Sequence, residues 1–368
     1  MAVAERGRSP ALLPPVSERL GPLAWLKRNL FSTWYNSLLT ILVGYLLYVV
    51  LVPFFEWAIL NATFFGDSKE ACDFDGACWA LITSRLGQYL YGLYPVAERW
   101  RVNAAFLLLI LAMVPLFLPR FRHRLLYACG LVFLYPPVAY LFFAGGVFGL
   151  PFVETAQWGG LFLTLVIAGV GITASLPIGV LLALGRRSEM PVIRALCVVF
   201  IEVIRGVPLV TILFMASVML PLFLPPGVTI DKLLRALIGV ALFASAYMAE
   251  VVRGGLQGIP KGQYEAAMAL GLGYWQMMGY VVLPQALRMV IPGIVNTFIG
   301  LFKDTALVTI IGLYDLLGMS RFIIQDPKWL GLAAESYLFA GFGFWVFCFA
   351  MSRYSMYVEK VLSAGERR

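Results

Sequence analysis

The sequence predicts an all-α membrane protein with about eight transmembrane helices. Of its 368 residues, 61% are hydrophobic and 13% are charged, and the mean hydropathy is +0.85. A soluble globular domain carries about 25% charged residues, so this chain is too apolar for that class. Long apolar stretches recur along it, and a helix needs about 20 such residues to cross a bilayer. We expect spans over residues 37–60, 104–118, 125–144, 158–185, 192–224, 233–252, 287–317 and 335–357.

Two of these predicted spans contain residues that interrupt a helix. Residues 192–224 include the segment Arg205-Gly206-Val207-Pro208, and residues 287–317 include Pro292, Lys303 and Asp304. Proline lacks the backbone N–H of a helical turn, and a charge at membrane depth is costly. We therefore expect an interruption in the first helix and a break or bend in the second.

The lysines and arginines predict the orientation in the membrane. A cytoplasmic N-terminus puts most of the 28 Lys and Arg on the cytoplasmic side, in agreement with the positive-inside rule. Arg99 and Arg101, in the external loop over residues 61–103, count against this arrangement. Residues 1–33 are polar and basic and lack the short apolar core of a signal peptide. We expect a multi-pass protein of the cell inner membrane with both termini in the cytoplasm.

The longest interval without a spanning stretch in the second half of the chain covers residues 258–284. Pro260 suits the first position of a helix, residues 263–270 are mostly good helix formers, and Gly271 supplies a stop. A second short helix is expected over residues 274–280. A helix–turn–helix between two spans is either an ordinary amphipathic linker or a docking surface for another protein.

Seven residues in this stretch stand at the fixed positions of a known motif. They are Glu265, Ala266, Ala267, Gly271, Val281, Leu283 and Pro284. Their spacing resembles the EAA loop of ABC importer permeases, and only Val281, where that pattern has isoleucine, departs from it. The resemblance implies that residues 255–284 form a cytoplasmic coupling loop that docks into a groove on an ATPase subunit. Ala266 and Ala267 would give it a flat face, and Glu265 would offer one charge.

Both flanks of this loop are similar to the polar amino acid permease subfamily. The matching segments are residues 200–209, 246–255 and 302–307. Val207 replaces a threonine of the commonest pattern, and Ala306 replaces a serine. The resemblance covers roughly residues 158–361. The three extra N-terminal helices and the large first loop look like the longer subunits of general L-amino acid (Aap/Bzt-type) importers.

This resemblance implies a domain organisation and a set of partners. Residues 1–33 would be a cytoplasmic segment, residues 34–150 an extra region with three transmembrane helices and an external loop, and residues 151–368 a five-helix type I importer core. The implied partners are a second permease in a heterodimer, two ATP-binding subunits, an extracytoplasmic solute-binding protein, an amino acid substrate and membrane lipid. The implied function is uptake of general L-amino acids by alternating access, driven by the ATPase subunits.

Other functional classes find little support. The sequence has no GxxxxGK[ST] phosphate loop, so we expect ATP hydrolysis on partner subunits and neither catalytic residues nor a bound cofactor here. We expect no metal site either, because His123 has no second ligand nearby and the residues from Asp73 to Gly76 lack the spacing of a calcium loop. The net charge of +8 forms no basic stripe for nucleic acid. The alternative is an ion-coupled secondary amino acid transporter, which would need inverted repeats that the sequence does not contain.

Ionisable residues within the predicted spans are candidates for ion pairs or for a substrate path. Glu202 and Arg205 are three residues apart, as are Glu250 and Arg253, so we expect an ion pair along one helical face in each case.

Lys303 and Asp304 are adjacent and point to different faces, so at least one needs a partner outside its own helix. Asn296 lies two turns before Asp304 on a similar face. A substrate path lined by Asn296, Asp304 and Thr305 would hold the ammonium and carboxylate of an amino acid. Hydrogen bonding between helices is the competing interpretation.

Two of the five cysteines share a polar loop. Cys72 and Cys78 both fall in the loop that the predicted orientation places outside, in an oxidising compartment. Gly76 lies between them and allows the chain to turn back. We expect a structural disulfide there, with two free thiols as the alternative.

Overall fold

A computed structural model describes residues 21–73, 75–118, 123–147, 149–225 and 227–364. These residues form helices joined by connections, so the predicted all-α fold class is confirmed. The predicted basic segment up to residue 20, the arginines at 120 and 122 and the last four residues lie outside the described part. The chain divides into two compact units, residues 1–62 with 73–77 and residues 63–72 with 78–368.

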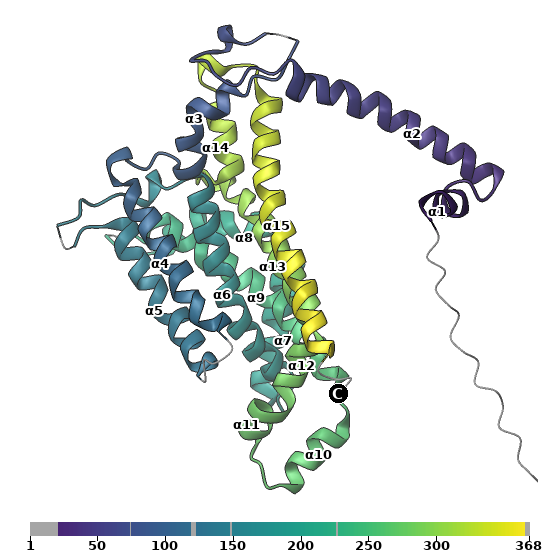
Figure 1. Cartoon of the computed structure of the whole chain (residues 1–368). Helices are drawn as coiled ribbons and strands as arrows, with labels where there is room; N and C mark the ends of the chain where they lie inside the picture. Colours follow the sequence, from purple (N-terminus) through teal and green to yellow (C-terminus); the bar gives the residue numbers. More distant parts are fainter. Residues whose placement is uncertain (1–20, 74, 119–122, 148, 226, 365–368) are drawn as a thin grey trace, which may run out of the picture. The chain divides into compact units, whose positions relative to one another are not determined.

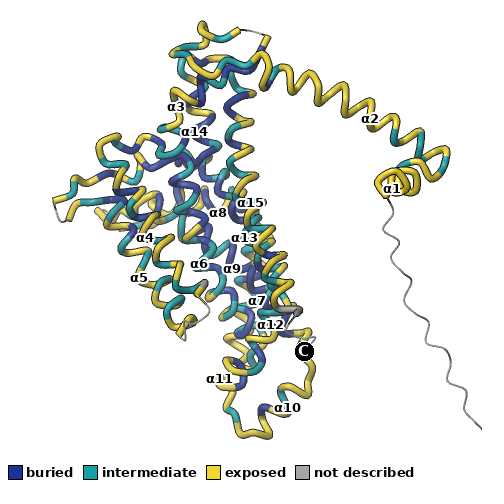
Figure 2. The backbone as a smooth tube through the Cα atoms, viewed as in Figure 1, coloured by how far each residue is buried: buried dark blue, intermediate teal, exposed yellow. Residues whose placement is uncertain are grey.

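The smaller unit contains α1 (Pro22–Asn29) and α2 (Trp34–Phe55), and α2 continues as a π-helix over Glu56–Leu60. Thr33 is the N-cap of α2, and its Oγ1 accepts a hydrogen bond from the N–H of Asn36 at 3.4 Å. No residue of α2 is buried (Figure 2). A helix that is apolar all round and exposed all round is typical of one surrounded by lipid.

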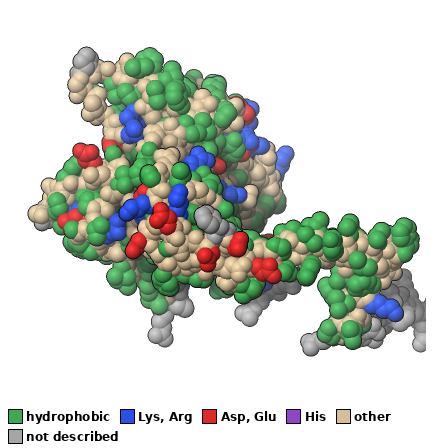
Figure 3. Space-filling view, turned by 90° about the horizontal axis from the view of Figure 1, so that it is seen from above, with side chains coloured by type: hydrophobic (Ala, Val, Ile, Leu, Met, Phe, Trp, Pro, Cys, Tyr) green, Lys and Arg blue, Asp and Glu red, His purple; other side chains and the backbone are tan. Residues whose placement is uncertain are grey.

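The larger unit is a helical bundle. Its α-helices are α3 (Ala80–Tyr91), α4 (Arg99–Phe117), α5 (Arg124–Ala144), α6 (Gly160–Arg186), α7 (Pro191–Gly206), α8 (Leu209–Phe214), α9 (Lys232–Gly258), α10 (Lys261–Ala269), α11 (Tyr274–Met277), α12 (Leu283–Met289), α13 (Ile291–Asp304), α14 (Leu316–Ile323) and α15 (Ala333–Ala364). Within this unit, α3 and α14 lie at one end and α10 and α11 at the other (Figure 1). Seen from the first end, charged side chains gather over the middle of the face, with hydrophobic ones around them (Figure 3).

The number of spans agrees with the sequence. Across the described residues, seven helices are long and apolar enough to cross a membrane, or eight when the bent pair of α7 with residues 209–223 counts as one. The central pair is α6 and α9, which pack along each other. The buried positions of α9 are mostly small: Ala236, Gly239, Ala241, Ala244, Ser245, Ala246, Ala249 and Gly255. Small side chains allow two membrane helices to approach closely, and this positions α9 as the centre of the unit.

Both predicted helix interruptions are confirmed. The axis bends by 104° between α7 and the helix that begins at Leu209, because Val207 is extended and Pro208 has no N–H to continue the helix. In the second case the chain breaks at Val290 and α13 begins at Ile291, with Pro292 in the first turn, where a missing N–H is tolerated. The α-helix then ends at Asp304 and tightens into a 3₁₀-helix over Thr305–Ile311.

The end of the larger unit that carries α3 and α14 is held by buried polar groups. Tyr89 of α3 and Ser336 of α15 share a hydrogen bond of 2.5 Å, and the Ser336 hydroxyl donates to the Ser320 carbonyl at 3.2 Å. Burial raises the pKa of Tyr89 to about 12. Asp315 caps α14 by accepting from the N–H of Gly318 at 2.8 Å. Burial raises the pKa of the Asp315 carboxyl, and the hydrogen bonds from the N–H groups of Gly318 and Leu317 lower it.

Two arginines that counted against the predicted orientation serve packing. Arg101 is fully buried: its Nε lies 2.9 Å from Oε2 of Glu98, its Nη1 donates to the Pro151 carbonyl at 3.1 Å, and its guanidinium covers the ring of Tyr94. The guanidinium of Arg99 covers the ring of Tyr91. Neither side chain is a free loop charge, so neither carries much weight in a count of membrane-flanking charges.

Candidate functional site

The predicted coupling loop is a helix, a glycine turn and a second helix. α10 ends in a left-handed turn at Gly271, whose φ is 74°. The N–H of Gly271 donates to the Met268 carbonyl at 2.9 Å, and the N–H of Leu272 donates to the Ala267 carbonyl at 3.2 Å. This pair of bonds is a Schellman motif, which satisfies the last carbonyls of the helix and requires a positive φ. The predicted stop at Gly271 is therefore present.

The second helix is longer than the sequence suggested. Gln276 caps α11 by accepting from the N–H of Gly273 at 3.1 Å. The helix then passes through a π-helical turn over Met278–Val282 into α12, whereas a short helix ending at residue 280 was expected. Pro284 supplies the physical reason, because its missing N–H is accommodated by widening the preceding turn instead of ending the helix.

One face of the loop packs against α9 and the other is exposed. Ala267 is buried in a cluster with Met277 and Val282 of the loop, Ala286 of α12 and Leu256 of α9. Glu265, Ala266, Gly271 and Pro284 are exposed, and Leu283 is half-buried. The predicted flat face is thus made by Ala266 without Ala267, because a buried position inside the Schellman turn needs an apolar contact.

A close backbone approach fixes α12 to α9. A Cβ at Gly255 would lie 2.6 Å from the carbonyl oxygen of Ala286, a distance that no side chain tolerates. Only glycine at 255 therefore allows the two helices to meet here. Gln285 also links α12 to α10, since its Nε2 donates to Oε1 of Gln263 at 3.1 Å.

Arg187 connects the loop to α6. Its Nη1 donates to the Leu256 carbonyl at 3.0 Å and to the Tyr264 hydroxyl at 3.1 Å, and its guanidinium lies over the Tyr264 ring. The Tyr264 hydroxyl in turn donates to the Leu256 carbonyl at 3.3 Å. Arg187 follows the last residue of α6, Leu256 belongs to α9 and Tyr264 to α10. These hydrogen bonds therefore connect α10 directly to the end of α6 and to α9.

A cluster of charges joins α6, α7 and α9 near the same end. Glu250 accepts from Arg186 at 2.8 Å and from Arg253 at 2.7 Å, and Arg205 lies 3.6 Å away. The expected Glu250–Arg253 pair is present. The expected Glu202–Arg205 pair is not, because Glu202 binds Arg186 of α6 at 2.9 Å and Arg205 turns to Glu250 and the ring of Tyr247.

The three residues of the predicted substrate path differ in their burial. Asn296 is exposed, Asp304 is half-buried at the end of α13, and Thr305 is buried with its hydroxyl donating to the Phe302 carbonyl at 2.8 Å. No ion pair found among the described residues involves Asp304 or the exposed Lys303, so the expected partner outside the helix is not in that part of the chain.

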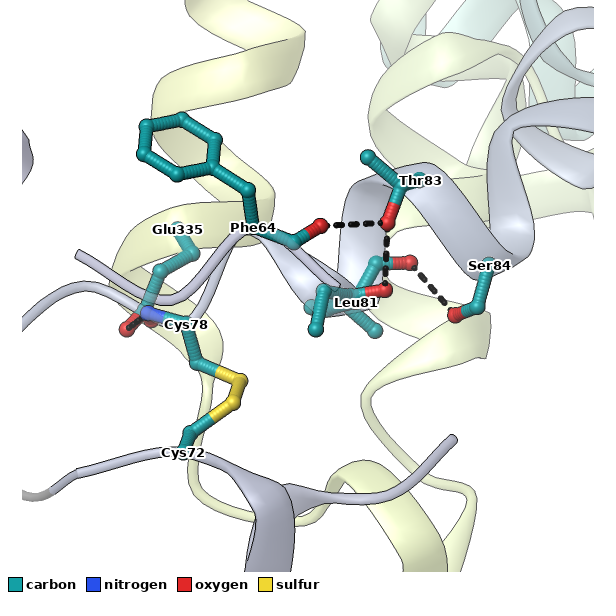
Figure 4. Close-up of a disulfide and its surroundings, with 8 residues drawn as sticks. Phe64, Cys72, Cys78, Leu81, Thr83, Ser84 and Glu335 are labelled. Carbon is teal, nitrogen blue, oxygen red and sulfur yellow. Dashed lines mark hydrogen bonds between the residues drawn. A yellow bond between two sulfur atoms is a disulfide. The ribbon is translucent and has the colours of Figure 1, made fainter. Parts of the chain in front are cut away.

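The loop that contains the predicted disulfide is tied to α15. Cys72 and Cys78 are joined through their sulfur atoms, with Cα atoms 5.6 Å apart (Figure 4). The N–H of Cys78 donates to Oε1 of Glu335, a buried residue in the first turn of α15, at 3.2 Å. The Thr83 hydroxyl donates to the Phe64 carbonyl at 2.9 Å. Cys78 is therefore fixed to the first turn of α15.

Sequence reasoning missed the roles of Arg186, Arg187 and Tyr264. The two arginines counted only as positive charges, although a basic pair at the end of a span is well placed to reach carbonyls and carboxylates of neighbouring helices. Tyr264 directly precedes Glu265 of the motif. The one available signal in the sequence was that Tyr264 adjoins this motif, whose Ala267 is buried.

Known proteins resemble the chain over most of its length. Residues 175–363 match the family described as binding-protein-dependent transport system inner membrane component. The inner membrane amino-acid ABC transporter permease protein YhdY of Escherichia coli is 55% identical, over 93% of this chain and 94% of that protein. The glutamate/glutamine/aspartate/asparagine transport system permease protein BztC of Rhodobacter capsulatus is 39% identical, over 96% of each chain.

Among solved structures, an amino acid ABC transporter with histidines has 31% identity and a TM-score of 0.48, and it covers 55% of this chain and 91% of its own. The family match covers more than half of the chain, and the two relatives cover nearly all of it. The chain belongs to the family of binding-protein-dependent transport system inner membrane components.

Proposed function

We propose that this chain is the permease subunit of an ATP-binding cassette importer that takes up amino acids. The observation that carries the proposal is the coupling loop, which buries Ala267 in a hydrophobic cluster and leaves Glu265 and Ala266 exposed at the end of the bundle. The names of the two relatives support amino acids as the substrate class. A broad range of L-amino acids is the finer proposal, because the relative BztC is named for four of them.

The exposed side of α10 is the proposed docking surface for an ATP-binding subunit in the cytoplasm. Glu265, Ala266, Gly271, Leu283 and Pro284 define it, with Ala267 as its internal anchor. The end of α15 lies at the same end of the larger unit as this loop, which supports the proposal of a cytoplasmic C-terminus (Figure 1). The remaining partners are a second permease in a heterodimer, a second ATP-binding subunit and an extracytoplasmic solute-binding protein. This chain holds no cofactor of its own, and its partners consume the ATP.

The proposed mechanism transmits loop movement through polar contacts. Closure of the ATP-binding subunits moves α10, and Tyr264 carries this displacement to Arg187 and so to α6 and α9. The cluster around Glu250 adds α7 to the same moving group. Because four helices then move together at the coupling end, the path between the spans can open to one side at a time.

Asp304 is the proposed contact for the α-ammonium of the substrate. The α-helix ends at this residue, and the change to a 3₁₀-helix leaves backbone groups available to polar ligands. Asn296 of α13 and Thr305, the first residue of the 3₁₀-helix, complete the proposed path. Recognition of groups that all amino acids share is compatible with a broad choice of side chains.

Uptake by reconstituted protein tests the proposal. Vesicles that contain this chain, its second permease and the ATP-binding subunits should accumulate labelled glutamate or glutamine only with ATP inside and solute-binding protein outside. Omission of the ATP-binding subunits should abolish uptake. Uptake that persists without them and collapses with an ionophore would instead establish the ion-coupled transporter.

A further inference from the structure

A cavity of about 870 Å³ separates the α4–α5 hairpin from α6 and α9. Most of its lining is aliphatic or aromatic, from Leu109 and Met113 of α4 through Leu131 and Tyr135 of α5 to Val166 of α6. All of these helices are candidate membrane spans of the larger unit. The cavity therefore lies at membrane depth and admits an apolar molecule.

Aromatic contacts close the cavity at one end only. The ring centroids of Phe143 in α5 and Phe162 in α6 are 4.8 Å apart, and those of Phe143 and Trp158 are 5.6 Å apart. Further along the helices, Met113, Val132 and Gly169 line the cavity and are exposed. The α4–α5 hairpin thus contacts the core at the start of α6. Along the rest of the hairpin, the cavity separates it from the core.

The closed end carries the polar groups of the cavity. Trp158 is 3% exposed, and its Nε1–H has no hydrogen-bond partner within the described residues. Asp231 also belongs to the lining, where it accepts from the Thr155 hydroxyl at 2.5 Å and from the N–H of Leu234 at 3.0 Å. A buried donor and a carboxylate at this end of an apolar cavity fit a ligand with an acceptor, a cation and a long apolar chain.

We infer that this cavity holds one phospholipid with an ammonium headgroup, phosphatidylethanolamine. An acyl chain lies between the hairpin and α6, a glycerol-ester carbonyl accepts from Trp158 Nε1–H, and the headgroup ammonium faces Asp231. Trp158 precedes α6 by two residues, at the depth where tryptophans meet the headgroup region. From Phe143 to Ala128 along α5 the cavity runs about 22 Å, enough for a chain that crosses one leaflet of a roughly 30 Å core.

A protein helix fits this cavity less well. A membrane helix satisfies its own backbone carbonyls, so it has none to offer to Trp158. The carbonyl of a lipid ester accepts no hydrogen bond from its own molecule, so it can accept one from Trp158.

Three variants of the full chain test the site. Gly169→Phe fills the cavity, and the structure has no atom within 4 Å of a Cβ there. Gly130→Phe is the matched control: a Cβ at this glycine of α5 also meets no atom, and Gly130 does not line the cavity. Asp231→Asn removes the charge and retains an N-cap for α9, since asparagine caps as well as aspartate.

Native mass spectrometry of the protein, released from vesicles of equal phosphatidylethanolamine and phosphatidylglycerol, gives the readout. Wild type and Gly130→Phe should retain one phosphatidylethanolamine per chain, and Gly169→Phe should lose it. Asp231→Asn should retain a lipid with the headgroup ratio reduced to about one, because the ammonium has lost its partner. A wild type without bound lipid, equal retention in Gly169→Phe, or a photocrosslinker at Leu165 that captures another polypeptide would each overturn the inference.

Discussion

The two ends of the larger unit are held together in different ways. At the end with α3 and α14, the polar groups of Tyr89, Ser336 and Asp315 are buried and bound to fixed partners. At the coupling end, the arginines around Glu250 keep 23–35% of their side chains exposed, and Glu265 and Gly271 are exposed. Exposed ion pairs contribute about 0–1 kcal/mol each and exchange partners readily, whereas buried polar groups tolerate one arrangement. The comparison indicates one rigid end and one end suited to movement.

The turn at Gly271 should show the largest effect on uptake. Gly271→Val puts a β-branched residue at φ 74°, which costs about 1–2 kcal/mol or more and reduces the population of the native turn by about tenfold. ATP-driven uptake in vesicles should fall at least as much, while the amount of protein in the membrane holds. Gly271→Asn is the control, since asparagine tolerates this conformation, and it should retain most activity. Normal uptake by Gly271→Val would contradict the docking role.

Replacement of Asp304 should lower uptake by a comparable amount, through weaker binding of the substrate and not through loss of assembly. Asp304→Asn retains the shape and removes the charge, so a charge-assisted hydrogen bond worth about 1.5–3 kcal/mol is lost. Uptake of every amino acid should fall together by about tenfold or more. Co-purification of the ATP-binding subunits should be unchanged. Loss of assembly would instead make Asp304 a structural residue, and unchanged uptake would remove it from the path.

Glu250 lies at the centre of the charge cluster and Glu202 lies at its edge, so variants of the two residues should differ in stability. Glu250→Gln leaves three arginines without their shared carboxylate, and we expect the variant to lose about 1–3 kcal/mol of stability at this end, together with several-fold lower uptake. Glu202→Gln is the matched control, because the Glu202 side chain is 55% exposed and has one arginine partner. Its effect should be below about 1 kcal/mol. Thermal unfolding of both variants in detergent, beside wild type, measures the difference, and equal losses would show that Glu250 is not the centre of the cluster.

The sequence predicted the apolar spans, both helix interruptions and the glycine stop, because each depends on local composition. It predicted the side-chain partners less well. The three-residue spacing paired Glu202 with Arg205, but Arg186 on another helix reaches Glu202 at 2.9 Å. In the same way, Ala266 and Ala267 are adjacent and chemically identical, yet only Ala267 is buried in the hydrophobic cluster. The cavity beside Trp158 depends on the distance between the α4–α5 hairpin and its neighbours α6 and α9. No periodicity in the sequence encodes that distance.

The disulfide should have the smallest effect on uptake, and it tests the rigid end. That Cys72 and Cys78 are bonded in the cell stays a prediction: alkylation without reductant, followed by mass spectrometry, should leave both unlabelled, while reductant should expose them. Replacing both with serine opens a short loop and should cost about 2 kcal/mol of local stability. Because the loop is also held by Glu335 and by the Thr83–Phe64 hydrogen bond, its fold should survive. ATP hydrolysis per amino acid transported should not change, since the hydrogen bonds from Cys78 to α15 and from Thr83 to Phe64 do not lead to α10. A change in that ratio would mean that the two ends are coupled, and the division into a rigid and a moving end would be wrong.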